Sequence, residues 1–133
     1  MIFLKLYLVT LPIFLIIDFI WLGFVANGFY KNQIGFLMKT NINWAAAVIF
    51  YFLFIAGMIV FVILPSLEKN SWVHALFLGA FFGFVTYATY DLTNFSTLKG
   101  WSIAVTVIDL AWGAFVTSLV STLAFFIAKR IGL

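Results

Sequence analysis

The sequence contains no cysteine and only one histidine. The absence of cysteine excludes disulfides, thiolate metal ligands and a cysteine nucleophile. A single histidine, His74, cannot build a zinc or haem site that needs several such ligands. The acidic residues also lack the diagnostic spacing of a magnesium or calcium motif. We therefore expect neither a metal nor any other cofactor.

Charged residues are scarce as well. They make up 8% of the 133 residues, whereas 66% are hydrophobic and 21% aromatic. The net charge of +3 comes from scattered side chains, which excludes a basic surface for nucleic acid. A soluble domain of this size cannot bury so much apolar surface, so the sequence predicts an integral membrane protein. We expect membrane lipids to be among its partners.

Long apolar segments predict four membrane-spanning helices, because one span needs roughly 20 apolar residues. The expected spans are residues 3–26, 44–64, 72–93 and 101–128, within one membrane domain covering 1–133. Asn43 is expected to cap the second span, and Pro65 to end it. Tyr51 carries the only side-chain hydroxyl group in the second span. Because the rest of that span is apolar, we expect it to provide lipid contact and packing. The predicted fold class is all-α, an antiparallel bundle of four transmembrane helices.

Residues 27–43 form the longest connection. Aromatic and polar residues recur there at helical spacing, which suits a short helix on the membrane interface; a loop with scattered aromatics fits equally well. In the third span, Ala75, Gly79 and Gly83 are four residues apart. Small residues at this spacing let helices approach closely, either within one bundle or between the two copies of a homodimer.

Positive charges provide a weak signal for orientation. Four spans place both termini on one side, together with the connection between the second and third spans. That side carries four positive residues and the opposite side three, namely Lys5, Lys69, Lys129 and Arg130 against Lys31, Lys39 and Lys99. The positive-inside rule therefore favours cytoplasmic termini by a narrow margin.

Two aspartates lie inside predicted spans, each in the same short phrase. Asp18 precedes Trp21 in the first span, and Asp109 precedes Trp112 at the same offset in the last. Each aspartate is eight residues from the span end on one common membrane face, which places both roughly 12 Å below that face. An ionisable side chain in lipid is costly and usually faces protein or a cavity. The equal depth predicts that the two aspartates belong to one site.

A polar stripe near the same membrane face extends along the third span. Tyr87, Tyr90, Asp91 and Asn94 follow one another at the spacing of one helix face. Asp91 lies near the expected end of that span, where an aspartate is more often solvated or anchors a loop. Tryptophans at the starts of spans are expected in the interfacial belt; they are Trp44, Trp72 and Trp101.

Carboxyl groups that meet in a dry bundle cannot all stay ionised, because desolvation and like charge both oppose it. An indole N–H from the same or a neighbouring helix can donate a hydrogen bond to such a group. The pair Asp18 and Asp109 can then carry a proton, bind a cationic ligand or act as an acid or base. Alternatively, both residues are structural and link helices through hydrogen bonds.

Several phrases resemble one family over essentially the whole chain. They are Lys5–Leu8, Asp18–Gly23, Gly28–Tyr30, Tyr87–Asn94 with Lys99–Trp101, and Asp109–Gly113. The chain resembles the bacterial family of four-span membrane proteins known as domain of unknown function 2177. The resemblance implies a protein of the bacterial inner membrane, and it implies no activity, substrate or catalytic residue.

Three functions are compatible with the sequence. The first is binding or transport of a small amphipathic or lipid-like molecule, with Asp18 and Asp109 as the titratable centre. The other residues expected around that ligand are Trp21, Trp112, Tyr87, Tyr90, Asp91 and Asn94. The second is a structural subunit or assembly factor of a membrane complex. The third, less favoured, is an enzyme acting on lipid head groups, with Asp91 or Asp109 as acid or base.

Overall fold

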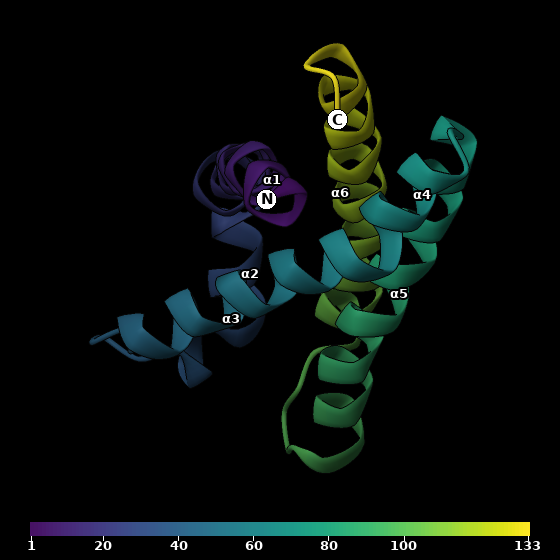
Figure 1. Cartoon of the computed structure of the whole chain (residues 1–133). Coiled ribbons are helices and arrows are strands. Elements are labelled where there is room, and N and C mark those ends of the chain that lie inside the picture. Colours follow the sequence, from purple (N-terminus) through teal and green to yellow (C-terminus); the bar gives the residue numbers. More distant parts are fainter.

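The computed structural model describes residues 1–133, and it is helical apart from short connections. Four helices are long and apolar enough to cross a membrane: Ile2–Val25, Trp44–Glu68, Trp72–Thr97 and Ile103–Arg130. The predicted helical membrane bundle is therefore confirmed. Figure 1 shows how these four helices are arranged along the chain.

Two of the four spans contain a π-helical turn. The first span is α1 (Ile2–Ile20) followed by η1 (Trp21–Val25), and the second is α3 (Trp44–Met58), η3 (Ile59–Ile63) and α4 (Leu64–Glu68). The third and fourth spans are the unbroken helices α5 (Trp72–Thr97) and α6 (Ile103–Arg130). The first connection contains α2 (Asn27–Ile34) and a single 3₁₀ turn, η2 (Gly35–Leu37), so it forms the short helix rather than an irregular loop.

Pro65 does not end the second span, which corrects the prediction. The helix continues through Pro65 to Glu68. The π-helical turn η3 immediately before it widens the backbone, and Pro65 then occupies the first turn of α4, where its missing N–H needs no partner. Asn43 does cap α3, since its side chain accepts a hydrogen bond from the Ala46 amide.

The third and fourth spans also differ from their expected ends. α5 extends to Thr97 rather than 93, so Asp91 lies well inside it. α6 begins at Ile103 rather than 101, because the Ser102 hydroxyl caps it by accepting from the Val105 amide. The connection between α5 and α6 is therefore only a few residues long and holds them as a hairpin.

The α5–α6 hairpin is the most extensive helix contact in the molecule. A Cβ atom on Gly83 would lie 2.0 Å from the Gly113 carbonyl oxygen, and one on Gly79 would lie 3.0 Å from the Ser118 Cα. The small residues of α5 thus pack against α6 within one chain. This contact occupies the face that a homodimer would otherwise use.

α1 packs along α6, and the second span reaches the hairpin mainly through η3 and α4. Figure 1 shows α3 running across the hairpin rather than alongside it. The buried hydrophobic cluster is formed mainly by α1, the second span and α6; its members are Leu6, Phe14, Phe54, Ile55, Met58, Ile59, Ile63, Val116, Val120, Ala124 and Ala128. The arrangement separates the start of α3 from α5.

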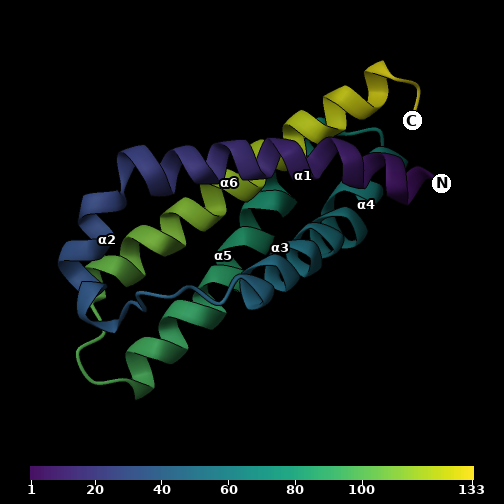
Figure 2. The same ribbon diagram turned by 90° about the vertical axis from the view of Figure 1, so that its left-hand side faces the viewer.

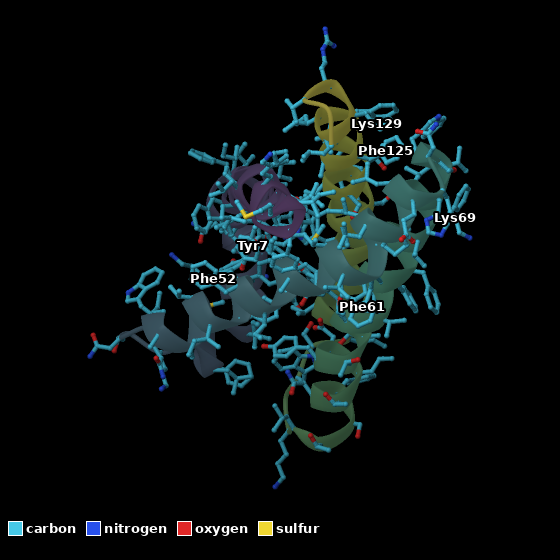
Figure 3. All side chains as sticks on the ribbon, viewed as in Figure 1. Tyr7, Phe52, Phe61, Lys69, Phe125 and Lys129 are labelled. Carbon is cyan, nitrogen blue, oxygen red and sulfur yellow. The ribbon has the colours of Figure 1, made fainter.

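The two ends of the molecule carry different features. Figure 2 shows both termini and the turn after α4 at one end, with α2 and the α5–α6 connection at the other. Lys69 directly follows α4 and Lys129 is near the end of α6; Figure 3 labels both, together with Phe61 of the second span. Phe61 and many other large apolar side chains are exposed, as expected for a surface that meets lipid.

Candidate functional site

A half-open cavity of about 570 Å³ lies between the helices at the end opposite the termini. Every membrane span and α2 contribute to its wall. The lining is mostly apolar and aromatic, and it includes the carboxyl groups of Asp18 and Asp109. Its volume falls in the range of roughly 300–1,000 Å³ that is common for small-molecule pockets.

Asp18 is held by two donors from two other helices. The Tyr51 hydroxyl of α3 donates to its Oδ2 at 2.7 Å, and the Trp112 indole of α6 donates to its Oδ1 at 3.3 Å. The side chain is only 5% exposed. Asp18 thus joins three spans and also faces the cavity.

Asp109 receives its hydrogen bond from the short helix α2. The Tyr30 hydroxyl donates to Asp109 Oδ1, and the Trp21 indole in turn donates to the Tyr30 oxygen at 3.2 Å. Burial, and next the hydrogen bond to Asp109, raise the pKa of the Tyr30 phenol above its ordinary value. Tyr30 therefore stays protonated as a donor, and α2 is fixed over this side of the cavity.

The repeated Asp and Trp phrases meet in the centre of the site. The Trp21 and Trp112 rings stack with centroids 4.3 Å apart and an angle of 7° between their planes. Each indole hydrogen-bonds towards the aspartate of the other phrase. Trp112 donates directly to Asp18, and Trp21 donates to Tyr30, which in turn donates to Asp109. The expected indole donor exists, and it comes from a neighbouring helix rather than from the same one.

Asp91 departs from the expectation of a solvated residue at a helix edge. It is fully buried, because α5 continues beyond it and α6 covers it. Neither of its oxygens accepts a hydrogen bond from an N–H or O–H group, and its side chain lies within hydrogen-bonding range of the Asp109 carboxyl group. Asp91 thus lies behind the cavity wall, which counts against its direct use as an acid or base on a head group.

The remaining site residues divide between the wall and its surroundings. Tyr87 and Tyr90 line the cavity, whereas Asn94 does not. The Tyr87 ring fills the space beside Gly113, where a Cβ atom would lie 2.3 Å from it. Trp101 is not a belt residue: it is 9% exposed, its indole donates to Thr106, and the Tyr90 ring meets it edge-on.

Sequence reasoning missed the partners that hold the aspartates in place. The sequence predicts only packing for Tyr51, in a lipid-facing helix, and no role for Tyr30. The signal for Tyr51 was its position as the polar side chain in an otherwise apolar span. No sequence signal placed Tyr30, because the docking of α2 depends on tertiary contacts such as the bond from Ser102 to Gln33, 2.6 Å long.

The arrangement offers two buried carboxyl groups with neutral donors on an aromatic wall. Phenol and indole donors stabilise a carboxylate without cancelling its charge. Aromatic faces attract cations and pack against apolar groups. The site can therefore receive a molecule with an apolar body and a polar or positively charged group.

Comparison with known proteins identifies a family and nothing more specific. No curated protein and no solved structure matches the chain. A family described as predicted membrane protein (DUF2177) matches residues 3–126, which is nearly the entire chain. With its four spans and its length-wide match, the chain belongs to this membrane-protein family, domain of unknown function 2177.

Proposed function

We propose that the protein binds, and moves across or within the membrane, a small amphipathic or lipid-like molecule. Its polar group lies near Asp18 and Asp109, and its apolar body lies against the tryptophan and tyrosine rings. The observation that carries the proposal is the convergence of both aspartates and both stacked tryptophans on one cavity of about 570 Å³.

The polarity of the wall supports an amphipathic ligand rather than a purely polar one. Twelve of the seventeen lining residues are hydrophobic. The other five are Asp18, Asn27, Lys31, Thr86 and Asp109, and tyrosine hydroxyls donate to the two aspartates. A ligand would therefore meet hydrogen-bonding groups at the aspartates and aromatic or apolar side chains over most of the remaining wall. A purely polar, water-soluble metabolite would make few favourable contacts with this apolar wall.

The proposal also includes a location and an orientation for the protein in the membrane. We place the protein in the bacterial inner membrane with both termini in the cytoplasm, so that the cavity lies in the outer half of the bilayer. The narrow excess of positive residues at the terminal end supports this orientation. Lipids surround the exposed apolar faces of the spans, and any second copy would contact a face other than the glycine ladder of α5.

The test compares three aryl probes of different charge: tetraphenylphosphonium, triphenylphosphine oxide and tetraphenylborate. Equilibrium dialysis measures their binding to protein in lipid nanodiscs, with empty nanodiscs as the blank. We expect saturable binding of at least one probe, with an affinity that changes about tenfold or more in Asp18→Asn and Asp109→Asn, since each change removes a carboxyl group, and with it a negative charge, from the wall. Glu68→Gln, which alters an exposed acid at the opposite end, is the matched control.

Each substitution by asparagine keeps an oxygen that accepts from the same tyrosine, so the fold is expected to survive. Thermal unfolding of every variant checks this point. Normal binding of all probes by both aspartate variants would refute the proposal. Loss of folding together with the absence of any bound probe in the wild type would instead favour a structural subunit.

A further inference from the structure

Asp91 is the buried acid that the proposed ligand contacts leave unexplained. Its side chain is completely inaccessible, and no N–H or O–H group donates to either oxygen. Asp91 lies opposite Asp109 across the α5–α6 contact, because Tyr87, one turn before Asp91, packs on Gly113, one turn after Asp109. The Asp109 carboxyl is within hydrogen-bonding range of Asp91. Burying a polar group without a partner costs several kcal/mol, roughly 2–7 depending on the reference state. The neighbouring Asp109 carboxyl is the group that can offset this cost.

Two carboxyl groups can form a hydrogen bond with each other only when one of them carries a proton. Asp91 and Asp109 together then hold one proton and one negative charge. Asp109 is the member of the pair that lines the cavity, whereas Asp91 does not. A charge brought into the cavity is therefore felt directly by the group that shares the proton.

We propose that the cavity takes up a lipophilic organic cation in exchange for the proton shared by Asp91 and Asp109. This inference rests on the proposed binding function and names the charge of its ligand. When the cation enters, the proton leaves the pair for bulk water. The charge of the pair changes from −1 to −2, and the charge of the cation compensates the difference.

The groups that face the pair determine whether the exchange is favourable. Those with titratable or charged side chains are Asp18 from α1, Tyr30 and Lys31 from α2, Tyr51 from α3, and Tyr87 and Tyr90 from α5. Asp18 adds a further acid to the cavity, and the tyrosines are neutral donors. Lys31 is the cation on this wall, and its side chain is exposed.

The aromatic wall completes the argument for a cation. Trp21, Trp112 and Tyr87 present rings to the cavity beside the two acids. A cation near such faces gains about 0.5–2 kcal/mol, the larger value when water is excluded. An anion would meet the acids and the ring faces unfavourably.

The experiment is calorimetric titration of tetraphenylphosphonium into the protein in nanodiscs, repeated in buffers with different ionisation enthalpies. The dependence of the observed heat on the buffer gives the number of protons released. We expect about one proton released per cation bound, and an affinity that rises up to about tenfold per pH unit while the pair is protonated.

In Asp91→Asn the amide donates to Asp109 without a shared proton, so we expect cation binding with little proton release. Glu68→Gln should release protons as the wild type does.

The outcomes separate this inference from the function on which it rests. Binding of tetraphenylphosphonium by the wild type without proton release refutes the exchange while leaving the binding function intact. Preference for triphenylphosphine oxide or tetraphenylborate likewise refutes the cation and keeps a binding site. Failure of all three probes refutes both. The wild-type measurement is decisive by itself if Asp91→Asn does not fold.

Discussion

At the scale of single residues, Asp18 and Tyr51 show how a buried carboxyl group is held between membrane spans. The carboxyl group receives two donors from two neighbouring spans, one at 2.7 Å and one at 3.3 Å. Such bonds orient the side chain towards the cavity and at the same time hold α1 against α3 and α6. Asp18 therefore links three spans through hydrogen bonds and also lines the cavity.

Tyr51→Phe removes the shorter of these two bonds and leaves the ring. We expect it to lower the free energy of unfolding by about 1–2 kcal/mol, because the acceptor is a buried acid. Tyr7→Phe is the matched control: Tyr7 joins the same two helices, but its hydroxyl donates at 2.7 Å to the neutral, exposed carbonyl of Phe52. Denaturation in detergent measures both. A cost for Tyr7→Phe equal to that for Tyr51→Phe would contradict this account of Asp18.

The sequence indicated which aspartates share a cavity but not what holds them. Equal distances from the span ends predict one site for Asp18 and Asp109, because helix rise is constant, and both residues line the cavity. The rotation of each helix about its axis was not predictable for α3, whose nearly uniform apolar surface gives no preferred face. For that reason Tyr51 was assigned to packing, and only the structure shows that it faces Asp18.

At the scale of secondary-structure elements, the α5–α6 hairpin is the most extensive helix contact of the molecule. It depends on glycine where the two backbones cross, since a Cβ atom on Gly83 would overlap the Gly113 carbonyl. A backbone atom cannot move aside without separating the helices. The spacing of small residues predicted a close contact, and the structure identifies α6 as its partner.

Gly83→Ala is therefore expected to destabilise the protein by about 1–3 kcal/mol or more, as overpacked substitutions do. Gly23→Ala is the control, because a Cβ atom there meets nothing within 4 Å. Thermal unfolding in detergent compares the two variants. Equal stability of Gly83→Ala and the wild type would show that the hairpin is looser than described.

The ends of elements were less predictable than their existence. Pro65 is a stop signal by local rules, yet the second span passes through it after a π-helical turn. The end of α5 was placed too early because its last turns are polar. Those turns carry threonines that bond to their own helix, such as Thr97 to the Thr93 carbonyl at 2.9 Å, and this compensates for the lower hydropathy.

At the scale of the whole molecule, the two halves of the bundle differ in packing. The half with the termini is filled by the hydrophobic cluster, whereas the other half contains the cavity beneath α2. The splayed path of α3 produces this difference, because α3 does not run along the hairpin. If the termini are cytoplasmic, the cavity lies in the outer half of the membrane.

The lack of native cysteine makes this orientation directly measurable. We expect Ser96→Cys, exposed at the cavity end, to react with a membrane-impermeant maleimide added to spheroplasts. Glu68→Cys, exposed at the terminal end, should react only after the membrane is permeabilised. The reverse pattern of labelling would place the cavity in the inner half, and equal labelling of both sites would indicate dual orientation.

The central claim is that the cavity itself is the binding site, and one pair of threonines on α5 tests it most directly. Thr86 lines the cavity, whereas Thr89 is exposed, and each hydroxyl bonds to its own helix. Thr86→Phe should fill part of the cavity and weaken tetraphenylphosphonium binding by about tenfold or more, the loss of roughly 1.4 kcal/mol. Thr89→Phe should bind like the wild type. Unchanged binding by a folded Thr86→Phe variant would contradict the claim.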